Sequence, residues 1–167
     1  MFADTMLAEL EQEARTTRRV LERVPGEHLG WRPDAKAMTL GQLAWHVATI
    51  PGGISGLARG DSLEAAGVNF EPEQPKSADE ILPAFDASLE RARDFLRGLT
   101  AEQAGAPWRL TEDGREIFTI PKAALIRTLM FNHWYHHRGQ LAVYYRCVGV
   151  PVPAIYGRSA DEKLFGA

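Results

Sequence analysis

A repeat of apolar residues in alternating steps of four and three constrains the fold of this chain more than any other feature. The repeat runs through four segments, at about residues 3–24, 39–57, 77–98 and 121–149. This spacing places apolar side chains on one face of a helix. Because four such faces can cover one another in a shared core, we predict an all-α fold, a four-helix bundle with long crossover connections.

Signals for helix starts and interruptions support this interpretation. Thr39 with Gln42, and Ser77 with Glu80, have the three-residue spacing of a capping box, in which side chains bond the free N–H groups of a first turn. Pro51 lies inside the second segment and cannot donate a backbone hydrogen bond. We therefore expect a kink or break there.

The connections between the segments differ in length and in expected structure. Residues 60–76 form a Gly- and Pro-rich stretch that is long enough to cross the bundle. Asp113-Gly114 lies between two short β-prone runs and predicts a small hairpin before the last helix. The tail carries Pro151 and Pro153 and should be extended or irregular. At 167 residues, the chain (1–167) fits a single domain.

Charge and composition argue against several classes of function. The net charge is −3, and the basic cluster Arg15, Arg18 and Arg19 alternates with acidic residues such as Glu13, which indicates a solvated helix face. No basic stripe with interleaved aromatics is present, so we expect no nucleic acid partner. The sequence contains no run of about 20 apolar residues, the length that is needed to span a membrane. The single cysteine, Cys147, suits a reducing, cytoplasmic location.

Two histidines stand in the apolar row of the fourth segment. His133 and His137 occupy successive positions of that row, between Met130 and Leu141. Side chains four residues apart project from one face of a helix, about one turn from each other. This spacing allows two imidazoles to bind one metal ion at N–metal distances of about 2.0–2.1 Å.

The third ligand is expected from another helix. His46 lies in the apolar row of the second segment, whereas His28 falls in a turn. The alternative is that these are ordinary hydrogen-bonded core histidines. Burying unpaired polar groups costs about 2–7 kcal/mol each, so a cluster of three favours coordination. Three neutral imidazoles also leave coordination positions open, as in a catalytic site. His136 is about 100° away around the helix and should lie beside the site.

Other catalytic motifs are missing from the sequence. A zincin needs glutamate directly after the first histidine, but Trp134 follows His133. The paired ExxH motifs of di-iron bundles, the GxSxG motif and phosphate-binding glycine loops are also missing. The sequence therefore identifies no general base.

Several motifs resemble the DinB/YfiT-like metalloenzyme family, and together they span almost the whole chain. They are Trp31-Arg32-Pro33, residues 39–46, residues 132–141 and residues 150–157. The resemblance implies a four-helix bundle, commonly a homodimer, and it carries the family's ligands onto His46, His133 and His137. The implied cofactor is one divalent ion, zinc or nickel, with iron and manganese as alternatives. Trp134 and Tyr145, expected on the outer face, are compatible with a dimer.

Three functions stay open at this point. The first is a metal-dependent enzyme, a hydrolase or a thiol S-transferase that joins a low-molecular-weight thiol (mycothiol, bacillithiol or glutathione in some relatives) to a small electrophile. The second is a non-enzymatic stress-response protein with a structural or sensing metal, and the third is an interaction domain with packed histidines.

The residues around the expected metal site have their own alternatives. His136, Arg138 and Gln140 are candidates for orienting the ligands or steering a substrate, and Tyr156 and Trp31 for lining the mouth of the site. For Arg138 a surface salt bridge is the stronger expectation, and the two aromatic residues have simple packing as their alternative.

Overall fold

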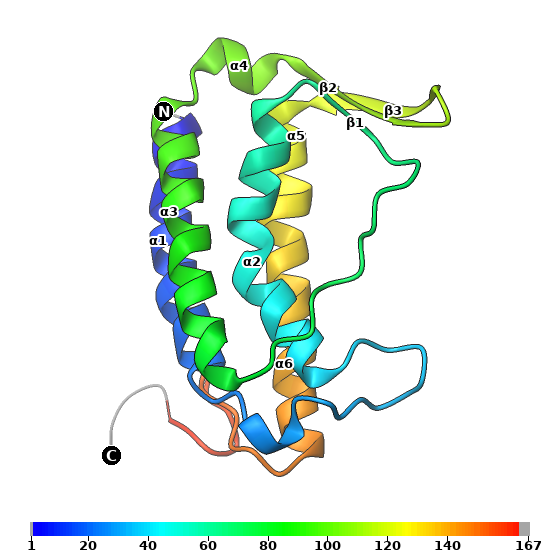
Figure 1. The fold of residues 1–167 in the computed structure, drawn as a ribbon. Helices are drawn as coiled ribbons and strands as arrows, with labels where there is room; N and C mark the ends of the chain where they lie inside the picture. The colour runs from blue at the N-terminus through cyan, green and yellow to red at the C-terminus, as the bar shows by residue number, and fades with distance from the viewer. Residues whose placement is uncertain (1, 164–167) are drawn as a thin grey trace.

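Long helices dominate the fold in this computed structural model, which describes residues 2–163 (Figure 1). The first three are α1 (Phe2–Leu21), α2 (Leu40–Arg59) and α3 (Ile81–Gly98). The last long segment joins α5 (Lys122–Leu125), a π-helix η3 (Ile126–Asn132) and α6 (His133–Cys147). Short elements are η1 (Gly26–His28), η2 (Ala78–Glu80) and α4 (Ala101–Gly105).

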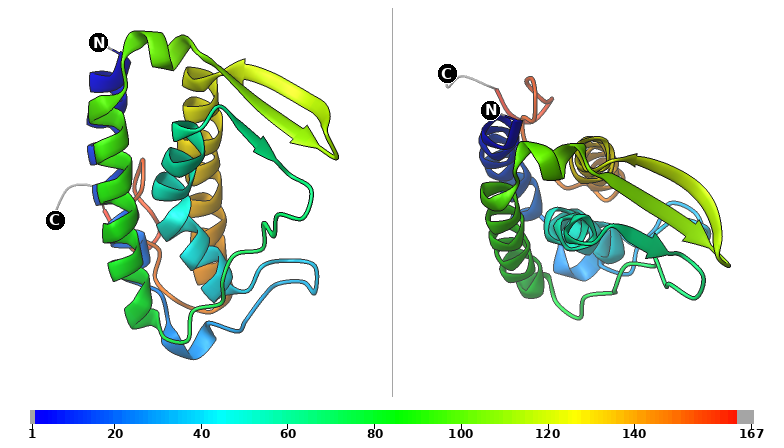
Figure 2. Two further views of the ribbon diagram at one scale, coloured as in Figure 1. Left: turned by 45° about the horizontal axis from the view of Figure 1, so that its top comes forward. Right: turned by 90° about the horizontal axis from the view of Figure 1, so that it is seen from above.

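The four long helical segments pack around one apolar core. Helix α3 contacts α1 and α2, while α6 contacts α2 and α1, so each segment has two neighbours (Figure 2). The predicted helical architecture is therefore confirmed in part, because the chain also contains a small three-stranded sheet. Within residues 2–163, no helix combines the length and the apolar character that a membrane crossing requires.

The sheet lies at one end of the helices and contains the predicted hairpin. Its strands are β1 (Ser62–Glu64), β2 (Pro107–Glu112) and β3 (Arg115–Pro121). Strands β2 and β3 are antiparallel, and Asp113 and Gly114 at their turn have positive φ angles of 49° and 74°. Strand β1 pairs in parallel with β2 and was not predicted, because three residues are too few for an apolar alternation to be visible.

The two predicted capping boxes have different outcomes. The Thr39 hydroxyl accepts a bond from the Gln42 N–H at 3.0 Å, and the Gln42 side chain accepts one from the Thr39 N–H at 3.0 Å. That box is confirmed. The Ser77 hydroxyl instead accepts from the Asp79 N–H at 3.1 Å and caps η2, which precedes α3, so the second box is wrong.

Helix α2 continues through Pro51, so of the expected kink or break the break is wrong, and the kink stays a prediction. Proline leaves the Val47 carbonyl without its usual partner one turn later. The Trp134 Nε1–H of α6 donates to that carbonyl at 2.9 Å, and the Gly52 N–H donates to the Ser88 hydroxyl of α3 at 2.8 Å. Neighbouring helices therefore satisfy the backbone groups around the proline, which keeps α2 continuous.

Trp134 and Tyr145 are both fully buried, which corrects the expectation that they lie on the outer face. The Tyr145 hydroxyl donates to the Val20 carbonyl of α1 at 2.8 Å. Helix α6 packs against both α2 and α1. It therefore buries two sides, whereas the sequence predicted a single apolar face. These two side chains consequently offer no surface to a second copy of the chain.

The C-terminal tail is irregular over residues 150–163, as expected. It lies against α1 and the turn after it: the Arg19 guanidinium of α1 donates to the Ala154 carbonyl at 3.3 Å, and the Arg23 guanidinium of the turn donates to the Pro151 carbonyl at 2.9 Å.

Candidate metal centre

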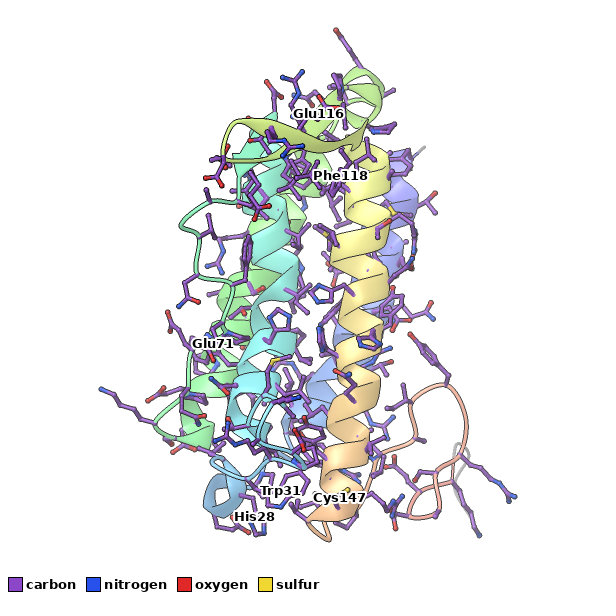
Figure 3. All side chains as sticks on the ribbon, turned by 90° about the vertical axis from the view of Figure 1, so that its right-hand side faces the viewer. His28, Trp31, Glu71, Glu116, Phe118 and Cys147 are labelled. Atoms are coloured by element: carbon purple, nitrogen blue, oxygen red, sulfur yellow. The ribbon has the colours of Figure 1, made fainter. Side chains whose placement is uncertain are left out.

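Three imidazoles from α2 and α6 converge at one point. The Nε2 atom of His46 lies 3.3 Å from Nε2 of His133, which lies 2.7 Å from Nε2 of His137. The structure thus brings together the three histidines predicted as ligands, and all three ligand atoms lie within 4.8 Å of one another. Figure 3 shows α2 and α6 side by side, with His28 near one end of these helices.

The geometry of the three nitrogen atoms fits a metal ion. Ligands about 2.0–2.1 Å from an ion are about 2.8–3.4 Å apart when the angle between them is octahedral to tetrahedral. The 3.3 Å separation of His46 and His133 falls in this range, and the 2.7 Å separation is slightly shorter. Each Nε2 atom of a neutral imidazole can either donate or accept a hydrogen bond, but not both. Three Nε2 atoms that face one another therefore cannot all be paired by hydrogen bonds among themselves. A cation would satisfy all three.

Gln140 orients one of the three ligands. Its side-chain oxygen lies 2.7 Å from Nδ1 of His137 and can only accept, so the proton of this imidazole is on Nδ1. The Nε2 lone pair of His137 then faces the other two histidines. Histidine ligands in metal sites usually donate their second N–H in this way. The predicted orienting role therefore has direct geometric support for Gln140.

A π-helix leads into the second ligand. The segment η3 ends at Asn132, and the backbone N–H of the next residue, His133, bonds to the Thr128 carbonyl five residues earlier. Its Nδ1 atom is buried and makes no hydrogen bond of good geometry. Single π-turns inside α-helices frequently occur at functional sites. Here the wider turn sets the rotation of α6 that brings His133 and His137 toward α2.

The three imidazoles are held in the neutral form that binds metal. Burial lowers the pKa of His46 to about 4, and the neighbouring imidazoles act in the same direction. Burial also lowers the pKa of His137 to about 4, with Gln140 opposing. Burial lowers the pKa of His133 too, while the nearby Leu129 carbonyl acts in the opposite direction. At neutral pH a cation therefore competes with few protons.

The lowered pKa values predict a pH dependence of stability in the metal-free protein. Unfolded histidine has a pKa of about 6.5, so between pH 6.5 and about 4 the unfolded chain binds more protons than the folded one. We therefore expect the contribution of His46 and His137 to the free energy of unfolding to be fully present above this pH range. It should be lost as the pH falls through the range.

The measurement is the urea unfolding midpoint of chelated protein at several pH values. The double variant His46→Gln/His137→Gln is the reference, because other groups also titrate. Wild type should lose more stability than the variant between pH 6.5 and 4. Parallel curves would contradict the assignment.

An open apolar groove of about 300 Å³ adjoins the three histidines. His46 and His133 form part of its wall, so a molecule in the groove would touch two of the three rings. Its other lining residues come from α2, β1 and the connection after β1, and they are Thr49, Ile50, Gly53, Ile54, Leu57, Leu63, Val68 and Phe70. The connection was not predicted to contribute, because its sequence shows no periodic pattern.

The remaining candidate residues lie at different distances from the centre. His136 is exposed, and its ring centroid is 5.0 Å from that of His137. Arg138 is 1% exposed and bonds to the Glu13 carboxylate at 2.6 Å and to the Tyr156 hydroxyl, on the side of α6 that faces α1. Neither Tyr156 nor Trp31 is among the residues that line the groove.

Two expectations about charged residues are thereby corrected. Arg138 makes a buried ion pair, not a surface one, and Glu13 is buried, not part of a solvated face. The reason is that α1 covers this side of α6. Charge spacing along a single helix does not show that contact.

Comparison with known proteins gives one consistent relationship. The sequence profile of the DinB family matches residues 1–163. The protein YrdA of Bacillus subtilis (strain 168) is 29% identical over 161 residues, which cover 95% of this chain and 90% of YrdA. A DinB-like protein from Bacillus cereus ATCC 10987 is similar in structure, with a TM-score of 0.67 and 27% identity over 93% of this chain and 100% of that one. The DinB-like protein YjoA of Bacillus subtilis shares the fold, with a TM-score of 0.67 and 21% identity over 88% and 96% of the two chains.

Proposed function

The chain belongs to the DinB family, and on that premise we propose that it is a single-domain, metal-dependent enzyme whose divalent ion is held by His46, His133 and His137. One observation carries the proposal: three Nε2 atoms converge at the wall of an open groove. A structural metal is normally closed off by a fourth protein ligand, often cysteine. Cys147 is the only cysteine in the chain, and it lies at the far end of α6 (Figure 3).

The protein supplies positioning and a water-poor environment. When bound, a divalent ion provides Lewis acidity that lowers the pKa of a thiol or water beside it. Gln140 holds the proton of His137 on Nδ1, which keeps the Nε2 lone pair available. The apolar groove places the second reactant next to His46 and His133 with little competing water.

Transfer of a thiol to an electrophile suits this site better than hydrolysis. The described residues that line the groove include no carboxylate that could serve as a general base for water. In thiol transfer, the sulfur forms a bond to an electrophilic carbon, the leaving group departs with the bonding pair, and the thiol proton goes to solvent. Zinc or nickel as the ion, a low-molecular-weight thiol, a homodimer and a cytoplasmic location belong to the same proposal.

Turnover of a model electrophile tests the reaction class. Protein reconstituted with zinc or nickel is mixed with 1-chloro-2,4-dinitrobenzene and, in turn, glutathione, cysteine, mycothiol and bacillithiol. We expect adduct formation with at least one thiol to rise above the uncatalysed rate by about 100-fold or more. Chelation and His133→Ala should both abolish the increase.

The alternative is a non-enzymatic metal-binding protein of the stress response, and the missing carboxylate base is the observation that favours it. In that case metal should bind with the same ligands, but no thiol should give a rate above the chelated control.

A further inference from the structure

We infer that the groove beside the histidines holds an uncharged, apolar portion of the substrate, and that Phe70 determines specificity for it. This inference rests on the proposed function and narrows its substrate class. The substrate would then have two parts, a reactive polar end at the histidines and an apolar group of ring or short-chain size in the groove.

The chemistry of the groove wall excludes charged and strongly polar groups. Among the described residues that line the groove, Thr49 is the only one besides the two histidines with a polar side-chain atom, and its hydroxyl already donates to the Trp45 carbonyl at 2.9 Å. A carboxylate or sugar placed here would lose water without gaining a partner, which is unfavourable. Apolar groups gain free energy in proportion to the apolar area that they bury.

The size of the groove limits its occupant to a small molecule. A volume of about 300 Å³ lies at the lower end of the range for ligand pockets and is too small for a peptide helix. Gly53 adds no side chain to the wall of the groove, and the position where its Cβ atom would stand is open space. A larger side chain at this point of α2 would reduce the volume without adding charge.

The outer wall is formed by apolar residues that the fold itself does not bury. Phe70 is 64% exposed and Val68 is 40% exposed, and both belong to the connection between β1 and η2. A phenylalanine this exposed contributes little to the core, so its place on the groove is best explained by contact with a ligand.

A polar row marks the opposite end of the site. Asn132 at the end of η3, and His136 and Gln140 of α6, are exposed and follow one another at four-residue spacing, beside His137 rather than along the groove. The two sides of the histidine cluster therefore differ in polarity. This difference orients a two-part substrate with its apolar group toward α2 and β1.

Binding of an uncharged apolar probe tests the groove without any metal. N-phenyl-1-naphthylamine fluorescence is titrated with metal-free wild type, Phe70→Asp, Gly53→Leu and Val143→Asp. Val143 is the matched control, because it is 61% exposed and does not line the groove. We expect one site in wild type and Val143→Asp, and affinity weakened about 10-fold or more in the other two variants. Equal affinity in all four proteins, or no binding in wild type, would overturn the inference.

A second titration separates this inference from the proposed function. Zinc-loaded protein is titrated with acetohydroxamate and octanohydroxamate, which share a metal-binding head and differ by six methylenes. Each buried methylene strengthens binding about fourfold, so the longer ligand should bind at least about 100-fold more tightly to wild type and less so to Phe70→Asp. Equal binding of both ligands would contradict the groove assignment. If neither hydroxamate binds while N-phenyl-1-naphthylamine still binds as expected, only the metal site is contradicted.

Discussion

His133→Ala and His137→Ala should each reduce the metal content of the purified protein from about one ion per chain to background. Each variant removes one of three converging Nε2 atoms and leaves two ligands, which hold a divalent ion much less tightly. His46→Ala should have the same effect from the other helix. The measurement is elemental analysis by plasma mass spectrometry on protein purified without a histidine tag and then incubated with zinc or nickel and desalted.

His136→Ala is the matched control for this experiment. It removes a histidine from the same helix, next to His137, but this side chain is exposed and its ring is not part of the converging cluster. It should retain about one ion per chain. Metal content unchanged in His133→Ala and His137→Ala would eliminate the site, provided that circular dichroism shows the variants folded.

The Arg138→Met substitution should lower the free energy of unfolding by about 3–5 kcal/mol. Arg138 and Glu13 are 1% and 5% exposed, and their ion pair at 2.6 Å joins α6 to α1. Arg138 also donates to the Thr17 hydroxyl at 2.9 Å. Removing the guanidinium leaves a buried carboxylate without its cation, and that unpaired charge accounts for most of the loss.

Two comparisons make this prediction specific. The double variant Glu13→Gln/Arg138→Met removes both charges and should recover most of the stability in urea unfolding. Arg97→Met removes an exposed partner of Asp94 and should cost less than about 1 kcal/mol. A loss below about 1 kcal/mol for Arg138→Met would show that the buried pair does not support the fold in the way described.

The helical architecture was predictable because four amphipathic segments leave few ways to bury their faces. The ligand histidines were predictable for a related reason: His46 and the His133–His137 pair stand out in otherwise apolar rows. The family resemblance selected the same residues. Their convergence at Nε2 required the structure, since a sequence gives the face of a helix but not its rotation against a neighbour.

The rotation of α6 could not be predicted, because η3 departs from the α-helical period. The expected apolar row passed through Met130, His133, His137 and Leu141. In the structure the buried residues of α6 are Trp134, His137, Arg138, Leu141 and Tyr145, while His133 is only partly buried. A π-turn has no reliable sequence signal, and it changes the face that all later residues present. The histidines therefore lie at the edge of the core, beside the groove, instead of in its centre.

The groove and the buried ion pair depend on contacts between distant parts of the chain. Phe70 lines the groove beside His46 and His133 because β1 pairs with β2 and carries the connection across α2. Glu13 meets Arg138 only because α1 packs on α6. Each of these residues looks like an ordinary loop or surface residue when its own segment is considered alone.

X-ray absorption at the metal edge of the zinc-loaded protein tests the central claim most directly. We predict a first shell with three imidazole nitrogens at about 2.0–2.1 Å, visible through the multiple scattering of the rings, plus light-atom ligands from solvent. In His137→Ala the ring scattering should decrease or the ion should be lost. A sulfur shell at about 2.3 Å, or a first shell without imidazole scattering, would contradict coordination by these three histidines.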